Sequence, residues 1–105
     1  MQSGVKVITA NVLVVGRKSD EVARATEALR TRGYAASGEI SDDDAIETLR
    51  NARVDIVVLG RGIDADSRNR LIETANARCP GVKIVEQFGG FENVISEVEE
   101  AKNSH

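Results

Sequence analysis

Two arginines stand where apolar runs of this chain end. Arg17 follows VLVVG, and Arg61 follows VDIVVLG. In an open parallel sheet, ligands bind outside the carboxyl ends of the strands. Two guanidinium groups at that edge, beside the hydroxyl of Ser19 and the backbone of Gly60, would suit an anion. Arg17, Ser19, Gly60 and Arg61 are therefore candidate anion-binding residues. The plainer alternative is that they are solvated loop residues and that the glycines serve turns.

The sequence offers no pair of residues suited to acid–base or nucleophilic catalysis. The only histidine, His105, is the last residue, and the only cysteine, Cys79, precedes Pro80 at a predicted helix end. A single glycine after VLVV does not make the Gly-x-Gly-x-x-Gly of a dinucleotide site. Asp20 and Asp64 suit helix N-caps better than catalysis. We therefore expect no enzymatic activity, no bound cofactor and no metal site.

The composition is that of one small globular domain, spanning residues 1–105. Hydrophobic residues make up 41% of the chain and charged residues 30%. A net charge of -3 and an aromatic content of 3% argue against binding of duplex or single-stranded nucleic acid. No apolar run approaches the roughly 18 residues of a membrane span, and the first ten residues lack a signal-peptide pattern. We expect a cytoplasmic protein without membrane contact.

Four apolar runs alternate with four amphipathic segments. Strands are predicted at 11–16, 34–40, 54–60 and 82–88. Helices are predicted from a cap at Ser19 or Asp20 to about Arg32, after a cap at Ser41, over 65–78, and over about 91–102. Residues 1–10 are an N-terminal extension, which either lengthens the first strand or adds an edge strand.

This alternation predicts a parallel sheet with right-handed crossovers. The runs at 11–16 and 54–60 are the most apolar, so we expect them in the centre of the sheet. The predicted fold class is α/β, a three-layer doubly wound parallel sheet with strand order 2-1-3-4 and helices on both faces.

The stretch GYAASGEISDDDAIETLRNARVDIVVLG, residues 33–60, resembles the response-regulator receiver family, which has a flavodoxin-like fold. Five residues fall in step with the pattern of that family, namely Gly33, Tyr34, Gly38, Asp42 and Ala45. The likeness covers roughly residues 11–100 and implies that the fifth strand–helix unit of a receiver is missing.

The resemblance also implies that the phosphorylation site is lost. Gly16 and Arg17 stand where receivers carry the acidic pair that holds magnesium, and Gly60 stands where they carry the phosphorylated aspartate. Glu86 and Gln87 occupy the place of the hydroxyl residue that closes on the phosphoryl group. Glycine has no side chain to phosphorylate, and an arginine would repel a dication. We expect no phosphorylation on aspartate.

These observations favour a non-catalytic, receiver-like module for protein interaction, which associates with itself or a partner. The expected surface is the strand at 82–88 with the following helix, because a receiver would cover that edge with a fifth strand. The candidate interface residues are Val82, Ile84, Phe91, Val94 and Val98.

Two alternatives stay open at this point. The chain is a monomer if its N-terminal segment folds back over its own edge strand. It is a sensor of a small anionic ligand or nucleotide if Arg17 and Arg61 hold an anion at the carboxyl ends of the first and third strands.

Overall fold

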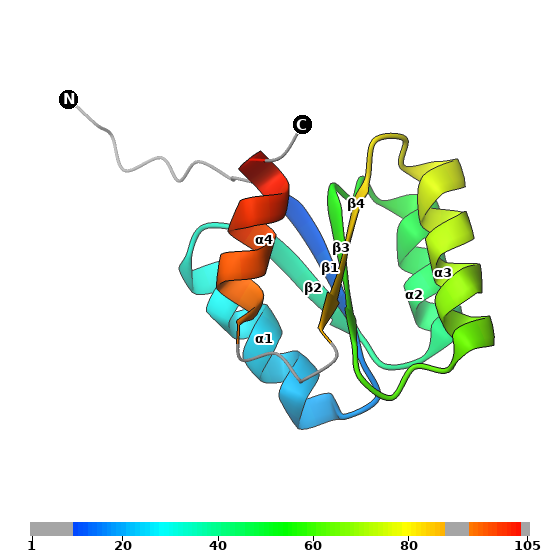
Figure 1. Ribbon diagram of the computed structural model, residues 1–105, viewed down its shortest axis with the longest axis horizontal. Coiled ribbons are helices and arrows are strands. Elements are labelled where there is room, and N and C mark those ends of the chain that lie inside the picture. The colour runs from blue at the N-terminus through cyan, green and yellow to red at the C-terminus, as the bar shows by residue number, and fades with distance from the viewer. Residues whose placement is uncertain (1–9, 88–92, 104–105) are drawn as a thin grey trace.

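The computed structural model describes residues 10–87 and 93–103, which form four strands and four helices in alternation (Figure 1). In chain order the elements are β1 (Asn11–Val15), α1 (Ser19–Thr31), β2 (Ala35–Glu39), α2 (Asp42–Asn51), β3 (Ile56–Gly60), α3 (Ala65–Arg78), β4 (Lys83–Gln87) and α4 (Val94–Asn103). The predicted residues 65–78 coincide with α3, and the predicted strands differ from the observed ones by one or two residues at their ends.

The sheet has the predicted order, β2-β1-β3-β4, and all its pairings are parallel. The two most apolar strands, β1 and β3, pair with each other through Val12 opposite Ile56 and Val15 opposite Leu59. Helices α1 and α4 cover one face of the sheet, and α2 and α3 cover the other (Figure 1). The prediction of a three-layer doubly wound fold is therefore confirmed.

Alternate residues of the central strands enter two separate cores. Val12 and Val14 of β1 pack with the helices α1 and α4 on one face. Leu13 and Val15 pack with α2 and α3 on the other face. All four side chains are at most 1% exposed. Because successive side chains of a strand point to opposite faces, a run of apolar residues requires helices on both sides.

The helix starts follow the predicted caps in two cases out of three. The Ser41 hydroxyl accepts a hydrogen bond from the Asp44 N–H at the start of α2, as predicted. Asp64 caps α3 by accepting from the Ser67 N–H. The predicted cap of α1 was wrong, because its N-cap is Lys18, and Ser19 is already helical. Lys18 is the last residue with an extended backbone before α1 and so occupies the N-cap position. Its side chain has no hydroxyl or carboxylate that could accept a hydrogen bond from the first turn.

The last helix begins at Val94, three residues later than the predicted start at Phe91, which lies outside the described residues. The predicted extension is also outside them, apart from Ala10. No helix within residues 10–87 and 93–103 is both long enough and apolar enough to cross a membrane.

Gly38 in β2 gives a test of how closely α1 packs on the sheet. A Cβ atom at this position would lie 2.5 Å from Val22 Cγ1 and 2.7 Å from Thr26 Oγ1, although Gly38 is exposed. Both neighbours are β-branched residues of a helix, which have little rotamer freedom. We expect Gly38→Ala to lower the free energy of unfolding by about 1–3 kcal/mol.

Urea denaturation followed by circular dichroism measures this change. The matched control is Ser37→Ala in the same strand, for which a change within about 0.5 kcal/mol is expected. A stabilised Gly38→Ala protein, as strand propensity alone would predict, would show that α1 moves away from β2 without cost.

Candidate functional site

The carboxyl edge of the sheet carries a set of paired charges. The chain leaves β1, β2 and β3 at this edge and enters α1, α2 and α3. Four side chains from these connections and helix starts meet there, and we call them the carboxyl-edge cluster: Arg17, Asp42, Ser67 and Arg70.

Arg17 joins the end of β1 to the start of α2. One of its terminal nitrogens, Nη1, donates to the Ile40 carbonyl oxygen at 2.6 Å, and the other, Nη2, lies 2.6 Å from Asp42 Oδ1. The Arg17 side chain also passes Gly62, whose positive φ of 89° favours glycine. The guanidinium group is thus held by a carbonyl and a carboxylate of the same molecule.

Asp42 is the centre of the cluster. Its Oδ1 accepts from Arg17, and its Oδ2 accepts from the Ser67 hydroxyl and lies 3.7 Å from Arg70 Nη1. The side chain is only 16% exposed. The hydrogen bond from Ser67, and then that from Arg17, lower the pKa of Asp42 below its ordinary value. The carboxylate therefore stays ionised and links β1, α2 and α3.

Arg61 is held by a different element from Arg17. Its Nη2 lies 2.9 Å from Glu21 Oε2, on α1. Ser19 is exposed in the first turn of α1, and Gly60 is the last residue of β3. The four predicted anion-binding residues therefore share one edge of the sheet, but their two guanidinium groups have separate carboxylate partners.

The positions that the resemblance to receivers compared with their phosphorylation site hold other interactions here. Gly60 has no side chain, and Arg17 is paired with Asp42. Glu86 at the end of β4 forms a bidentate pair with Arg68 of α3, with both contacts at 2.6 Å. The hydrogen bond from Arg68 lowers the pKa of Glu86. Among the described residues, no group of three histidine, cysteine or carboxylate side chains is arranged to hold a metal ion.

The predicted interface residues divide between edge and core. Val82 and Ile84 are partly buried and pack against the core formed with α2 and α3. Val94 and Val98 are only 3% and 0% exposed, because they face the sheet from α4. They belong to the core and offer no exposed contact, and Phe91 lies outside the described residues.

From the sequence, the run Asp42, Asp43 and Asp44 at the start of a predicted helix indicates a solvated first turn that suits the helix dipole. The structure separates them, since Asp42 is partly buried in the cluster and the other two are exposed. The available signal was the opposite charge of Arg17 and Asp42, which follow two strands predicted to be neighbours. Nothing in the sequence indicated the pair of Arg68 and Glu86, because the two residues lie eighteen positions apart, in α3 and β4.

Neither protein-family models nor curated protein sequences match this chain. Among solved structures, the chain is similar to the pilus assembly protein CpaE from Caulobacter crescentus CB15. The TM-score is 0.53 at 14% sequence identity, and the match covers 91% of this chain and 79% of the other. At this identity the likeness concerns the fold, which is the flavodoxin-like α/β fold with four parallel strands in the order 2-1-3-4.

The carboxyl-edge cluster should contribute measurably to stability. Replacing Asp42 by asparagine removes a charge that accepts hydrogen bonds from Arg17 and Ser67. We expect Asp42→Asn to lower the free energy of unfolding at pH 7 by about 1–2 kcal/mol. The matched control is Asp43→Asn in the same helix turn, with a change within about 0.5 kcal/mol expected because Asp43 is exposed.

The difference between the wild type and Asp42→Asn should also depend on pH. The folded-state pKa of Asp42 is lowered, so the unfolded chain binds the proton more tightly than the folded protein does. The stabilisation is therefore complete above the unfolded pKa of about 3.9 and is lost as the pH falls through the folded pKa. Urea titrations at a series of pH values should show a gap that is constant near neutrality and narrows in acid. A gap that widens in acid would contradict this assignment.

Proposed function

We propose that this chain is a non-catalytic module for protein interaction that has the receiver-like fold and takes no phosphoryl group on aspartate. The observation that carries the proposal is the pairing of charges at the carboxyl edge. Arg17 with Asp42, Arg61 with Glu21, and Arg68 with Glu86 are ion pairs within the molecule. Such pairs fix the loops and helix starts of this edge, and position 60 is a glycine, which has no side chain to receive a phosphoryl group.

The edge strand β4 is the proposed surface of self-association. Within the described part of the chain, β4 pairs on one side only, with β3. The Lys83 N–H donates to the Asp55 carbonyl, so the backbone of Lys83 faces β3. Since peptide groups alternate along a strand, the N–H and C=O of Ile84 point to the outer side. An outer row of this kind is a template for another strand.

A sensor of small anions at the carboxyl edge is the second candidate, and it fits the arrangement less well. An anion bound by Arg17 or Arg61 would compete with the carboxylates of Asp42 and Glu21. Breaking the pair of Arg17 would leave the mostly buried Asp42 with fewer donors, which costs free energy.

The similarity to CpaE supports a role in assembly rather than in phosphoryl transfer. The solved structure is titled a pilus assembly protein, and the present chain aligns with most of it. We propose by analogy of fold that this module also serves to bring protein chains together.

Self-association through β4 predicts a selective effect of proline. Ile84→Pro removes an outward N–H but leaves the ladder bond of Lys83 to β3 intact. Ile84→Ala shortens the side chain and keeps the N–H, so it is the matched control. In size-exclusion chromatography with light scattering, the wild type and Ile84→Ala should have twice the monomer mass, and Ile84→Pro the monomer mass. A wild type that is monomeric at micromolar concentration would refute self-association.

The absence of an acceptor at position 60 predicts no phosphorylation. After incubation with a small acyl phosphate and Mg²⁺, the intact mass of the protein should be unchanged, because no carboxylate replaces the family's aspartate at Gly60. A receiver that keeps its phosphorylated aspartate is the positive control. An added phosphoryl group that hydroxylamine removes would reveal an acyl phosphate on this chain and overturn the assignment.

A further inference from the structure

The strand β2 forms the edge of the sheet opposite to β4. Within the described part of the chain, β2 pairs on one side only, with β1. The Ala35 N–H donates to the carbonyl oxygen of the residue before β1, and the Glu39 carbonyl oxygen accepts from the N–H of the residue after β1. Because the backbone groups of successive residues alternate between the two sides of a strand, those of Ala36 and Gly38 point away from β1. The strand β2 therefore has an outer row of peptide groups, as β4 does.

An arginine side chain occupies part of this outer row. Arg30 Nε donates a hydrogen bond to the Ala36 carbonyl oxygen at 2.8 Å. Ala36 is only 6% exposed, although it belongs to an edge strand. Arg17 holds the carbonyl oxygen of Ile40, the residue after β2, at 2.6 Å. A second strand could therefore not bond to the Ala36 carbonyl without displacing the guanidinium group of Arg30.

The short connection between α1 and β2 brings Arg30 to this edge. Arg30 lies in the last turn of α1, and its neighbour Leu29 is fully buried in the core. Gly33, with a φ of 94°, reverses the chain after the helix, so β2 begins beside the end of α1. Arg30 stands only six positions before Ala36. A long side chain on the exposed face of this last turn can therefore reach the outer edge of β2.

The side chains of β2 itself give its edge little protection. The strand reads AASGE, so four of its five residues are small. The charged residue, Glu39, accepts a hydrogen bond from the Thr48 hydroxyl at 2.9 Å and is thereby bound to α2. Open edges with small side chains pair readily with other strands, and natural proteins protect them with charged groups. Arg30 is the charged group that contacts the outer row of β2.

We propose that Arg30 is an edge-protecting residue, whose hydrogen bond to Ala36 prevents β2 from pairing with the β2 strand of a second copy of this chain. An approaching strand would have to take the Ala36 carbonyl from Arg30 and bury the guanidinium group without its acceptor, which costs free energy. Two copies of the same edge can pair about a two-fold axis, so the assembly that Arg30 prevents is a dimer through β2. This role does not depend on self-association through β4, because β2 and β4 lie at opposite edges of the sheet.

The mass of Arg30→Ala in solution tests this proposal. In size-exclusion chromatography with light scattering, Arg30→Ala should have at least twice the mass of the wild type at the same micromolar concentration. The comparison is repeated in the Ile84→Pro background, which blocks β4. There Ile84→Pro should be a monomer, and the double variant Arg30→Ala/Ile84→Pro should be a dimer.

The two backgrounds separate this proposal from self-association through β4. A monomeric wild type would refute pairing through β4, but the doubled mass of Arg30→Ala would still support the role of Arg30. Equal masses of Arg30→Ala and the wild type would overturn that role, whatever the state of β4. Circular dichroism establishes that each variant is folded.

Arg24→Ala is the matched control, because Arg24 is a 78% exposed arginine of the same helix whose ion-pair partner, Asp20, also lies on α1. Its mass should equal that of the wild type. An equal increase of mass in Arg24→Ala would overturn the proposal, since the loss of any arginine from α1 would then suffice.

Two further measurements show whether β2 itself forms the contact. Ala36→Pro removes an outward N–H and keeps the bonds of Ala35 to β1, so Arg30→Ala/Ala36→Pro should return to the mass of the wild type. Hydrogen exchange of the Gly38 amide should slow with rising concentration in Arg30→Ala and not in Arg24→Ala. A doubled mass that Ala36→Pro leaves unchanged, or a Gly38 amide that exchanges equally fast at all concentrations of Arg30→Ala, would place the contact elsewhere and overturn the proposal.

Discussion

The structure depends on the complete burial of β1 and β3 in the middle of the sheet. Their side chains alternate between two cores, so each face of the sheet must be covered by helices. Parallel strands with helical crossovers are the arrangement that meets this need. The parallel arrangement also determines which residues lie at each edge of the sheet. All strands point the same way, so their carboxyl ends and the starts of the helices α1, α2 and α3 lie at one edge, and their amino ends lie at the other.

At the carboxyl edge, the charged side chains pair with one another and so stabilise the fold. Asp42 receives hydrogen bonds from Arg17 and Ser67 and so ties three successive crossover units together. In an enzyme or a phosphorylated receiver, carboxylates at this edge must be available to a metal ion or a phosphoryl group. Here a guanidinium group and a hydroxyl group already occupy the oxygens of Asp42. The fold that supports phosphorelay chemistry in receivers therefore supports, in our proposal, a module that acts by binding protein chains at its surface.

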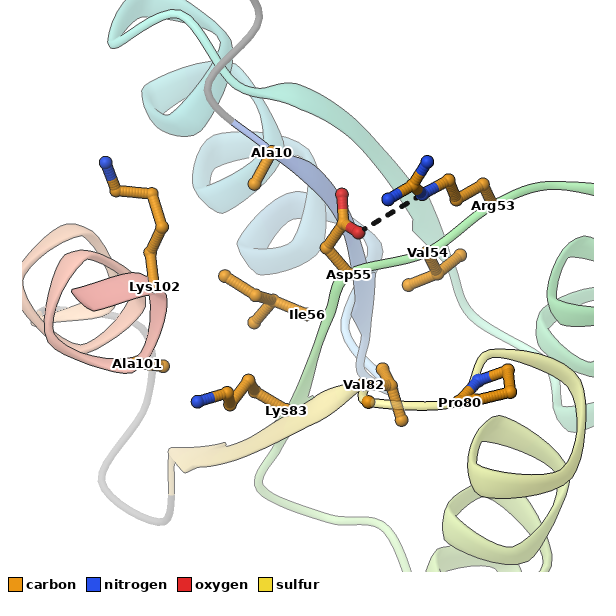
Figure 2. Close-up of a pocket in the computed structure, with 11 residues that line it drawn as sticks. Ala10, Arg53, Val54, Asp55, Ile56, Pro80, Val82, Lys83, Ala101 and Lys102 are labelled. Atoms are coloured by element: carbon orange, nitrogen blue, oxygen red, sulfur yellow. Dashed lines mark ion pairs between the residues drawn. The ribbon is translucent and has the colours of Figure 1, made fainter. Parts of the chain in front are cut away.

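The charges in the first and last turns of the helices follow the helix dipole. The described helices α1, α2, α3 and α4 have acidic residues in their first turns and a basic residue in their last turns, as the helix dipole favours. This places Lys102 at the end of α4, beside the amino ends of the strands. Lys102 borders a pocket that Ala10, Val54 and Ile56 also line (Figure 2).

The sequence by itself determined the four strands, their order and the bounds of α3, because apolar periodicity and the residues Gly33, Ser41 and Asp64 act locally. It also determined that position 60 has no side chain to phosphorylate. Only the tertiary structure decided which charges pair. Arg17 pairs with Asp42 and not with the two acidic neighbours of Asp42. The reason is the position of α2 relative to the end of β1, which brings together two side chains that are 25 residues apart in the chain. A pocket at the amino ends of the strands likewise joins residues from Ala10 to Lys102, and nothing in the order of the residues indicates such a space between packed elements.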